Sequence, residues 1–198
     1  GQSIFRAVLL LAEFKVEKDI EKTIKNIKLQ DVYDWLDKGK TFKIDTRREG
    51  EHDFKSVNVS AEIGKKIIKK IKEEKEHTLK IDYDNPDVLF YIYIKDDKGY
   101  FGVDFAGIEL AKRQYKIFNH PESLKGTTGY SVVRKSGFKK KNFLLDPFMG
   151  SGVIVIEAGL FATDFPVQYY NKDKLYFTKY DFFKEYGRDR FFKEQDSK

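Results

Sequence analysis

The chain has 198 residues, of which 40% are hydrophobic and 16% aromatic, so it is long and apolar enough for one large domain or two small ones. It contains no cysteine, which excludes disulfides and thiolate metal sites and favours a reducing cytoplasm, and no apolar run is long enough to span a membrane. Lys and Arg outnumber Asp and Glu by 38 to 32, and the resulting net charge of +6 predicts a polyanionic partner.

The first hundred residues show the strand and helix patterns of a compact α/β unit. Residues 3–14 are apolar and fit either a strand or a helix. Apolar spacing and turn residues then predict, in chain order, a helix from Asp19, a strand over 41–47, a helix capped by Ser56, and a hairpin of strands over 87–95 and 100–105. The buried stripe of the long helix is predicted to contain Val59, Ile63, Ile67, Ile68 and Ile71.

This half of the sequence also resembles a known RNA-binding module. The segments that carry the resemblance are Phe42–Gly50, Phe54 with Ser56, Glu62–Gly64, Asn85–Val88 and Gly102–Asp104. Over residues 5–105 they resemble a THUMP domain, which is attached to several tRNA- and rRNA-modifying enzymes. The resemblance implies an RNA-binding domain over 1–107, which begins with the remnant of a ferredoxin-like region.

Basic residues near the predicted strand over 41–47 are candidate contacts to RNA phosphates. Such contacts would position an RNA without reading its sequence. The candidate RNA-binding residues are Lys40, Lys43, Arg47, Arg48, Lys55, Lys112 and Arg113. The alternative for the strand residues is an ordinary solvated basic face. That interpretation is favoured for the lysines of the long helix, because glutamates are interspersed among them.

A junction follows at Pro121, which suits the first position of a helix that would end at Gly137. His120 stands directly before this helix. It is interpreted as a capping or pocket-wall residue, because the only other histidines are His52 and His77 and no metal-ligand spacing appears. The sequence therefore predicts no metal site.

The same junction resembles THUMP-linked methyltransferases. The residues that carry the resemblance are Lys112-Arg113-x-Tyr115 and His120-Pro121-x-Ser123-Leu124-Lys125-x-Thr127. In that family the segment packs beside a glycine loop and lines the pocket of S-adenosylmethionine (SAM). The resemblance implies cofactor contacts from Lys125, Thr127 and Thr128.

The most specific pattern in the chain runs from Asn142 to Ala158. Residues 143–145 are apolar, which predicts a fully buried parallel strand that ends at Asp146. A glycine turn over 150–152 and an apolar helix over 153–161 follow. Strand, acidic residue, glycine turn and helix in this order build a ligand site at the carboxyl edge of an α/β sheet, where the free amides of the helix start favour polar or anionic groups.

The residues of this turn exclude two glycine-loop chemistries. A phosphate-binding loop would need a lysine directly after Gly152, and a dinucleotide fingerprint would need a glycine where Val155 stands. Asp146–Gly152 with Ile156-Glu157-Ala158 resembles instead the first motif of class I SAM-dependent methyltransferases that modify exocyclic amines of nucleobases. The resemblance implies that SAM is bound by Asp146, Pro147, Phe148, Gly150, Ser151, Gly152 and Glu157. The alternative is a structural strand, turn and helix without a ligand.

Residues 164–198 are rich in aromatic and charged side chains. They fit either a surface that stacks on single-stranded RNA or, as the favoured interpretation, a helical layer packed against a methyltransferase core. Amino methyltransferases of this type also need an Asn/Asp-Pro-Pro-aromatic motif. No two of the four prolines in this chain are adjacent, so the catalytic residues are not identified.

Together these patterns predict an α/β chain in which an α+β THUMP-like domain over 1–107 precedes a linker and the first part of a Rossmann-like methyltransferase domain over 108–198. The chain is expected to be the middle of a longer enzyme and inactive without the rest. The predicted function is SAM-dependent methylation of guanine N2 in tRNA by a cytoplasmic monomer that binds neither membrane nor metal. The alternative is a non-catalytic tRNA- or RNA-binding THUMP protein.

Overall fold

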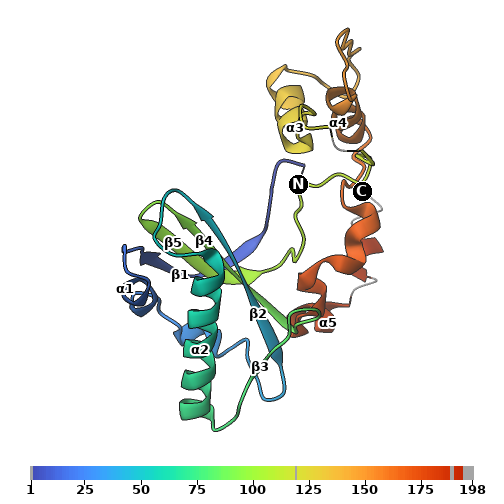
Figure 1. Cartoon of the computed structure of the whole chain (residues 1–198). Coiled ribbons are helices and arrows are strands. Elements are labelled where there is room, and N and C mark those ends of the chain that lie inside the picture. Colours follow the sequence, from blue (N-terminus) through green and yellow to red (C-terminus); the bar gives the residue numbers. More distant parts are fainter. Residues whose placement is uncertain (1, 119, 188–189, 194–198) are drawn as a thin grey trace. The chain divides into compact units, whose positions relative to one another are not determined.

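The computed structural model describes residues 2–118, 120–187 and 190–193, and the chain separates into two compact units (Figure 1). The first, called the sheet unit below, comprises Val8–Phe105 and Lys179–Asp181. The second, called the helical unit, comprises Gly1–Ala7, Ala106–Thr178 and Phe182–Lys198.

The sheet unit contains one five-stranded sheet in the order β1-β5-β4-β2-β3. Its strands are β1 (Val8–Lys15), β2 (Thr41–Glu49), β3 (Lys80–Ile81), β4 (Val88–Lys95) and β5 (Lys98–Asp104). β2 runs parallel to β3 and β4, whereas β5 runs antiparallel to β4 and β1. The strands predicted in this unit are confirmed, and the ambiguous apolar opening forms a strand from Val8 onward. The two-residue β3 was missed, because a pair of residues shows no alternation.

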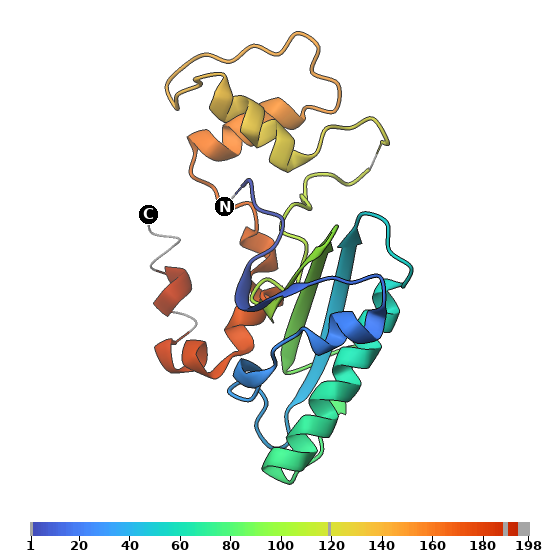
Figure 2. The ribbon, with the colours of Figure 1, turned by 90° about the vertical axis from the view of Figure 1, so that its left-hand side faces the viewer.

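Two helices cover one face of this sheet (Figure 2). α2 (Ser56–Lys75) connects the parallel strands β2 and β3, and α1 (Ile20–Lys25) lies beside α2. The predicted stripe of α2 is buried except for Ile68, which is half-buried. The predicted cap is wrong: Lys55 occupies the N-cap position without a side-chain hydrogen bond, and the Ser56 hydroxyl accepts a hydrogen bond from Arg48 Nε at 3.3 Å.

Three residues from late in the chain, Lys179–Asp181, belong to the sheet unit. Tyr180 is buried and packs edge-on against Trp35 with ring centroids 5.2 Å apart, and its hydroxyl donates to the carbonyl of Asp104 at 2.8 Å. Lys40 pairs with Asp181 at 2.7 Å. Residues 179–181 therefore belong to this unit through an aromatic contact, a buried hydrogen bond and an ion pair.

The described part of the helical unit contains helices and no strand. Its elements are α3 (Gly126–Lys135), α4 (Val153–Ala162), the 3-10 helices η2 (Tyr169–Lys174) and η3 (Tyr176–Lys179), and α5 (Asp181–Tyr186), the last two of which begin or end in the sheet unit. The helix predicted from Pro121 begins instead at Gly126, because Lys125 is extended. It ends as predicted, with Gly137 in the left-handed region at φ +77°.

The strand predicted over 143–145 is not formed. Phe143 is 89% exposed and Leu145 is 74% exposed, although both are apolar enough for a sheet interior. A buried parallel strand needs a hydrogen-bonding neighbour on at least one side, and the described residues of this unit provide none. The helix predicted over 153–161 is confirmed as α4.

The aromatic stretch over 164–198 forms short helices in its described part, while 188–189 and 194–198 lie outside the described residues. Its rings pack on one another, as between Phe165 and Tyr169 and between Phe177 and Phe183, whose centroids are 5.3 Å and 4.7 Å apart. The predicted helical character is thus confirmed.

Candidate functional site

The glycine turn before α4 is shaped by two glycines and one acidic side chain. Gly150 and Gly152 have φ of +54° and +71°, a region in which side chains are strained. The carboxylate of Asp146 accepts a hydrogen bond from the Phe148 amide at 3.3 Å. The first amides of a helix have no partner within it, and Gly152, the N-cap of α4, has no side chain that could cap them.

This turn offers an open approach to a ligand. A Cβ atom added at Gly150 would meet only the carbonyl oxygen of Phe148, at 3.8 Å. Most predicted cofactor residues lie at this surface: Pro147, Phe148, Gly150 and Ser151 are exposed, Asp146 is half-buried, and Gly152 is buried. Open backbone, free amides and the 93% exposed ring of Phe148 fit a small molecule with polar and apolar parts, which describes SAM.

The segment before α3 lies beside the turn. The hydroxyls of Ser123 and Ser151 are 2.9 Å apart, and the Cβ position of Gly129 lies 2.7 Å from a methyl group of Val153. The structure therefore brings Lys125, the N-cap residue of α3, into the neighbourhood of the turn. The resemblance predicted this grouping for Lys125, Thr127 and Thr128. Which of these side chains contact a cofactor stays a prediction.

Glu157, on α4, differs from the other predicted cofactor residues because its side chain is fully buried. Its carboxylate pairs with Arg113, with Nε to Oε1 at 2.6 Å and Nη2 to Oε2 at 3.3 Å. The Tyr115 hydroxyl donates to the same Oε1 at 2.7 Å. Burial raises the pKa of Tyr115 well above its usual range, and the hydrogen bond to Glu157 raises it further.

Arg113 was predicted to contact RNA, and the structure contradicts this. Its side chain is fully buried, and its five N–H donors have five acceptors. Besides the two oxygens of Glu157, these acceptors are the carbonyls of Leu110, Ala111 and Gln2. A guanidinium with every donor used inside the protein has none for a phosphate. The sequence hid this role, since Arg113 stands in a basic, polar segment.

The other predicted RNA-binding residues lie at the surface, and most have acidic neighbours. Lys43 and Arg47 pair with Asp45 and Glu49 on the same strand, at 3.4 and 3.0 Å. Arg48 lies 5.6 Å from the centre of the Phe54 ring. Lys112 is exposed and lies 4.0 Å from Glu109, and Lys55 is exposed at the start of α2.

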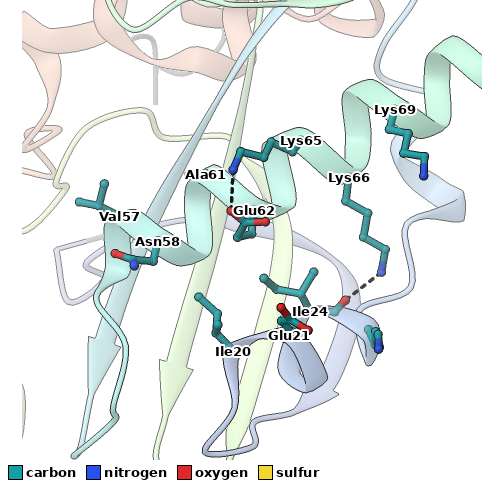
Figure 3. A pocket seen from close by; sticks show the side chains of 11 residues that line it. Ile20, Glu21, Ile24, Val57, Asn58, Ala61, Glu62, Lys65, Lys66 and Lys69 are labelled. Atoms are coloured by element: carbon teal, nitrogen blue, oxygen red, sulfur yellow. Dashed lines mark hydrogen bonds and ion pairs between the residues drawn. The ribbon is translucent and has the colours of Figure 1, made fainter.

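A second basic surface lies in a groove between α1 and α2 (Figure 3). The groove has a volume of about 720 Å³, and Ile20, Ile24, Val57 and Ala61 supply its apolar lining. Lys66 points toward the end of α1 and donates to the carbonyls of Ile24 and Ile27, at 2.8 and 3.2 Å. Burial lowers the pKa of Lys66, with a smaller effect from the charge of Lys70. The remaining charged lining residues are Glu21, Lys25, Glu62, Lys65 and Lys69.

His120 does not cap α3, which begins at Gly126; its Nδ1 accepts a hydrogen bond from the Glu122 amide at 3.3 Å. Among the described residues, no group of three or more His, Asp or Glu side chains is arranged to hold a metal ion. None of the described helices is both long enough and apolar enough to cross a bilayer.

Comparison with known proteins assigns both halves of the chain. Residues 15–104 match the THUMP domain family, and residues 113–193 match the family described as RMKL-like, methyltransferase domain. Two relatives are called tRNA (guanine(6)-N2)-methyltransferase. The one from Methanocaldococcus jannaschii is 35% identical over 81% of this chain and 45% of its own length. The one from Archaeoglobus fulgidus is 32% identical over 84% of this chain and 42% of its own length.

A solved structure shares the fold. The crystal structure of SMU.472 complexed with SAH aligns with 98% of this chain and 50% of that chain, at a TM-score of 0.74 and 19% identity. The chain therefore spans about half the length of the relatives and the structure that it matches.

Proposed function

We propose that the whole protein, which belongs to the RMKL-like methyltransferases that carry a THUMP domain, transfers a methyl group from SAM to an RNA. One observation carries this proposal. A THUMP domain and the open glycine turn of a methyltransferase domain occur in a single chain, so a module that holds RNA is covalently joined to a site that fits SAM. Two curated relatives with both regions bear the name of a tRNA methyltransferase.

The cofactor proposed for the turn is SAM. When bound, it supplies an electrophilic methyl group on a sulfonium. The turn would hold the methionine end of SAM through the amides at the start of α4 and the surface of Asp146–Ser151, with Lys125, Thr127 and Thr128 on the adjoining wall. Glu157 would act beneath this surface through the residues that it contacts, since its carboxylate is buried.

The substrate proposed is guanine N2 in tRNA, at position 6 as in the names of the two relatives. SAM bound at the turn would supply its methyl group to the exocyclic nitrogen and leave as SAH, and the nitrogen would release a proton. Such a reaction depends chiefly on holding nitrogen, carbon and sulfur in line. The base must first leave its stack to reach the pocket.

RNA would be positioned by basic residues that are exposed or half-buried at the surface. The proposed contacts are Lys40, Lys43, Arg47, Arg48, Lys55 and Lys112; Arg113 leaves this set. Their acidic neighbours are mostly on the same strand or turn, so a phosphate would have to compete with short surface ion pairs, which are weak.

Methyl transfer from labelled SAM by the whole protein tests the proposal. We expect label in a tRNA transcript with guanine at position 6 and none when that position carries adenine. Ribosomal RNA and duplex DNA serve as competing substrates. Label in DNA with none in any RNA would overturn the substrate assignment. RNA binding without label in any substrate would favour the non-catalytic alternative.

Cofactor binding at the turn is tested by Gly150→Asn. Asparagine tolerates the left-handed conformation of this residue, and its side chain would occupy the open approach. We expect the affinity for SAH, measured by calorimetry on the whole protein, to fall by roughly tenfold or more, as for the loss of one or two charge-assisted hydrogen bonds. Gly137→Asn is the matched control, because Gly137 is also left-handed and has no atom near its Cβ position. Equal SAH affinity in the two variants would place the cofactor elsewhere.

A further inference from the structure

Glu157 and Arg113 form a charge pair in which both side chains are fully buried. Glu157 lies on α4, about one helical turn after the helix begins at Val153. Arg113 lies outside the helices, in the segment that leads from the sheet unit toward α3. The pair therefore fixes the first turns of α4 to a part of the chain that is distant in sequence.

The contacts around this pair are too close to allow much variation. A Cβ atom at Gly126 would lie 2.6 Å from the Nε of Arg113 and 2.7 Å from the Oε1 of Glu157. One helical turn further along α3, a Cβ atom at Gly129 would lie 2.7 Å from Val153, the first residue of α4. Two glycines thus let α3 lie directly on the buried pair and on the start of α4.

A hydrogen bond also connects the segment before α3 to the glycine turn. Ser123, three residues before α3, meets Ser151 inside the turn with hydroxyls 2.9 Å apart. Inside the turn the Gly152 amide donates to the carbonyl of Met149 at 2.8 Å, but Phe148, Met149, Gly150 and Ser151 are exposed and are not held by burial. The position of the turn therefore depends on α4 and α3, and the relative position of α4 and α3 depends on the buried pair.

We propose that Arg113 and Glu157 are positioning residues, which hold α4 against α3 so that the amides of the Gly150–Gly152 turn point at the cofactor, and that neither side chain touches the cofactor or the RNA. This inference rests on the proposed function for the identity of the ligand. The effect of the buried pair on the turn exists in the free protein. The forked guanidinium suits this role because it bonds Glu157 and three backbone carbonyls at once.

Arg113→Lys is the first test, because lysine keeps the charge but has a single nitrogen and cannot bridge these acceptors. Amide hydrogen exchange in the free whole protein should become faster over residues 150–155 and stay unchanged over the sheet unit. SAH affinity, measured by calorimetry, should fall by roughly tenfold, a factor that the loss of one or two hydrogen bonds to the ligand would give. Tyr115→Phe keeps the pair and removes one hydrogen bond to Glu157, so it should show the same changes to a smaller extent.

Arg113→Met combined with Glu157→Met separates positioning from simple stabilisation. Replacing both members of a buried pair by apolar residues often restores stability that a single replacement loses. The double variant should therefore regain thermal stability relative to Arg113→Met alone and still exchange rapidly over residues 150–155. Parental exchange rates over the turn in either Arg113→Lys or the double variant would overturn the inference. A parent protein that binds no SAH would count against the proposed function and leave the exchange test intact.

Discussion

In the sheet unit large apolar side chains such as Phe42, Phe90 and Phe101 are fully buried, whereas in the helical unit Phe118, Phe143 and Phe148 lie on the surface. The helical unit instead buries a charge pair, Arg113 with Glu157, whose donors are all used. Burial of apolar area is non-directional and tolerates small shifts. A buried ion pair is stable only in one geometry. The packing of the sheet unit thus favours stability, and the buried pair of the helical unit favours one particular arrangement of its helices.

The largest effect is expected when one phenylalanine in each unit is truncated and the two losses of stability are compared. Phe90→Ala removes a fully buried ring from the centre of the sheet and should destabilise the sheet unit by about 3–5 kcal/mol. Phe148→Ala removes an exposed ring and should leave unfolding unchanged. Denaturant unfolding followed by fluorescence reports the first effect directly, because the single tryptophan, Trp35, packs in the sheet unit against Phe105 and Tyr180. A similar loss of stability from Phe148→Ala would show that its ring is covered in solution.

A second comparison uses two glycines of the helical unit. Gly126→Ala would place a methyl group within 2.7 Å of both Arg113 and Glu157, and overpacking of this kind costs about 1–3 kcal/mol. Gly159→Ala, in the middle of α4, meets no atom within 4 Å and should stabilise the helix by about 0.5–1 kcal/mol. Thermal unfolding followed by far-ultraviolet circular dichroism should show opposite shifts. A Gly126→Ala variant with unchanged thermal stability would mean that Arg113 and Glu157 have room to move.

The same contrast explains how far the sequence alone predicts this molecule. The strand over 41–47 and the stripe of α2 were predicted because their apolar period matches a single buried face, and the strand over 87–95 because its apolar run is almost continuous. Both are local properties. The strand over 143–145 was wrong, because a parallel strand depends on neighbours that the period cannot show. The turn and α4 were predicted from the glycines within residues 150–152.

The site was predictable only in part, for a similar reason. The glycine turn has a specific local pattern, and a resemblance placed Lys125 beside it. The pairing of Arg113 with Glu157 joins residues far apart in sequence, and neither neighbourhood distinguishes a buried charge from a solvated one. A hint was present in Gly126 and Gly129, a pair of small residues one turn apart on a helix, which indicates close packing of another element.

The next comparison concerns the RNA surface. It is between the basic residues Lys43, Arg47 and Lys55 on β2 and at the start of α2, called the β2 edge, and the groove between α1 and α2. Arg47→Glu with Lys55→Glu and Lys65→Glu with Lys69→Glu change the charge equally. We expect the first pair to weaken tRNA binding more, and each lost phosphate contact should lower the salt dependence by about one unit of slope. Lys55→Glu places an acid at the start of α2, where it favours the helix, so weaker binding would not reflect unfolding.

Gel-shift titrations at several salt concentrations measure both effects. A larger loss from the lysine pair of the groove would move the RNA surface from the β2 edge to the groove between α1 and α2. Arg48 is left unchanged in both variants, because it bonds Ser56 and lies over the Phe54 ring, and its loss would disturb packing.

The smallest expected effect concerns the acid stability of the sheet unit. The Tyr93 hydroxyl donates to Glu49 at 2.7 Å, and this bond, together with the charge of Arg47, lowers the pKa of Glu49. A carboxylate whose folded pKa is lowered stabilises the fold above its unfolded pKa, and this contribution is lost as the pH falls through the folded pKa. Glu49→Gln should therefore flatten the acid limb of a stability profile measured by denaturant unfolding between neutral and low pH. Tyr93→Phe keeps the carboxylate and removes the main cause of the shift, so it should flatten the same limb. An acid limb unchanged in both variants would show that solvent screens this exposed pair completely.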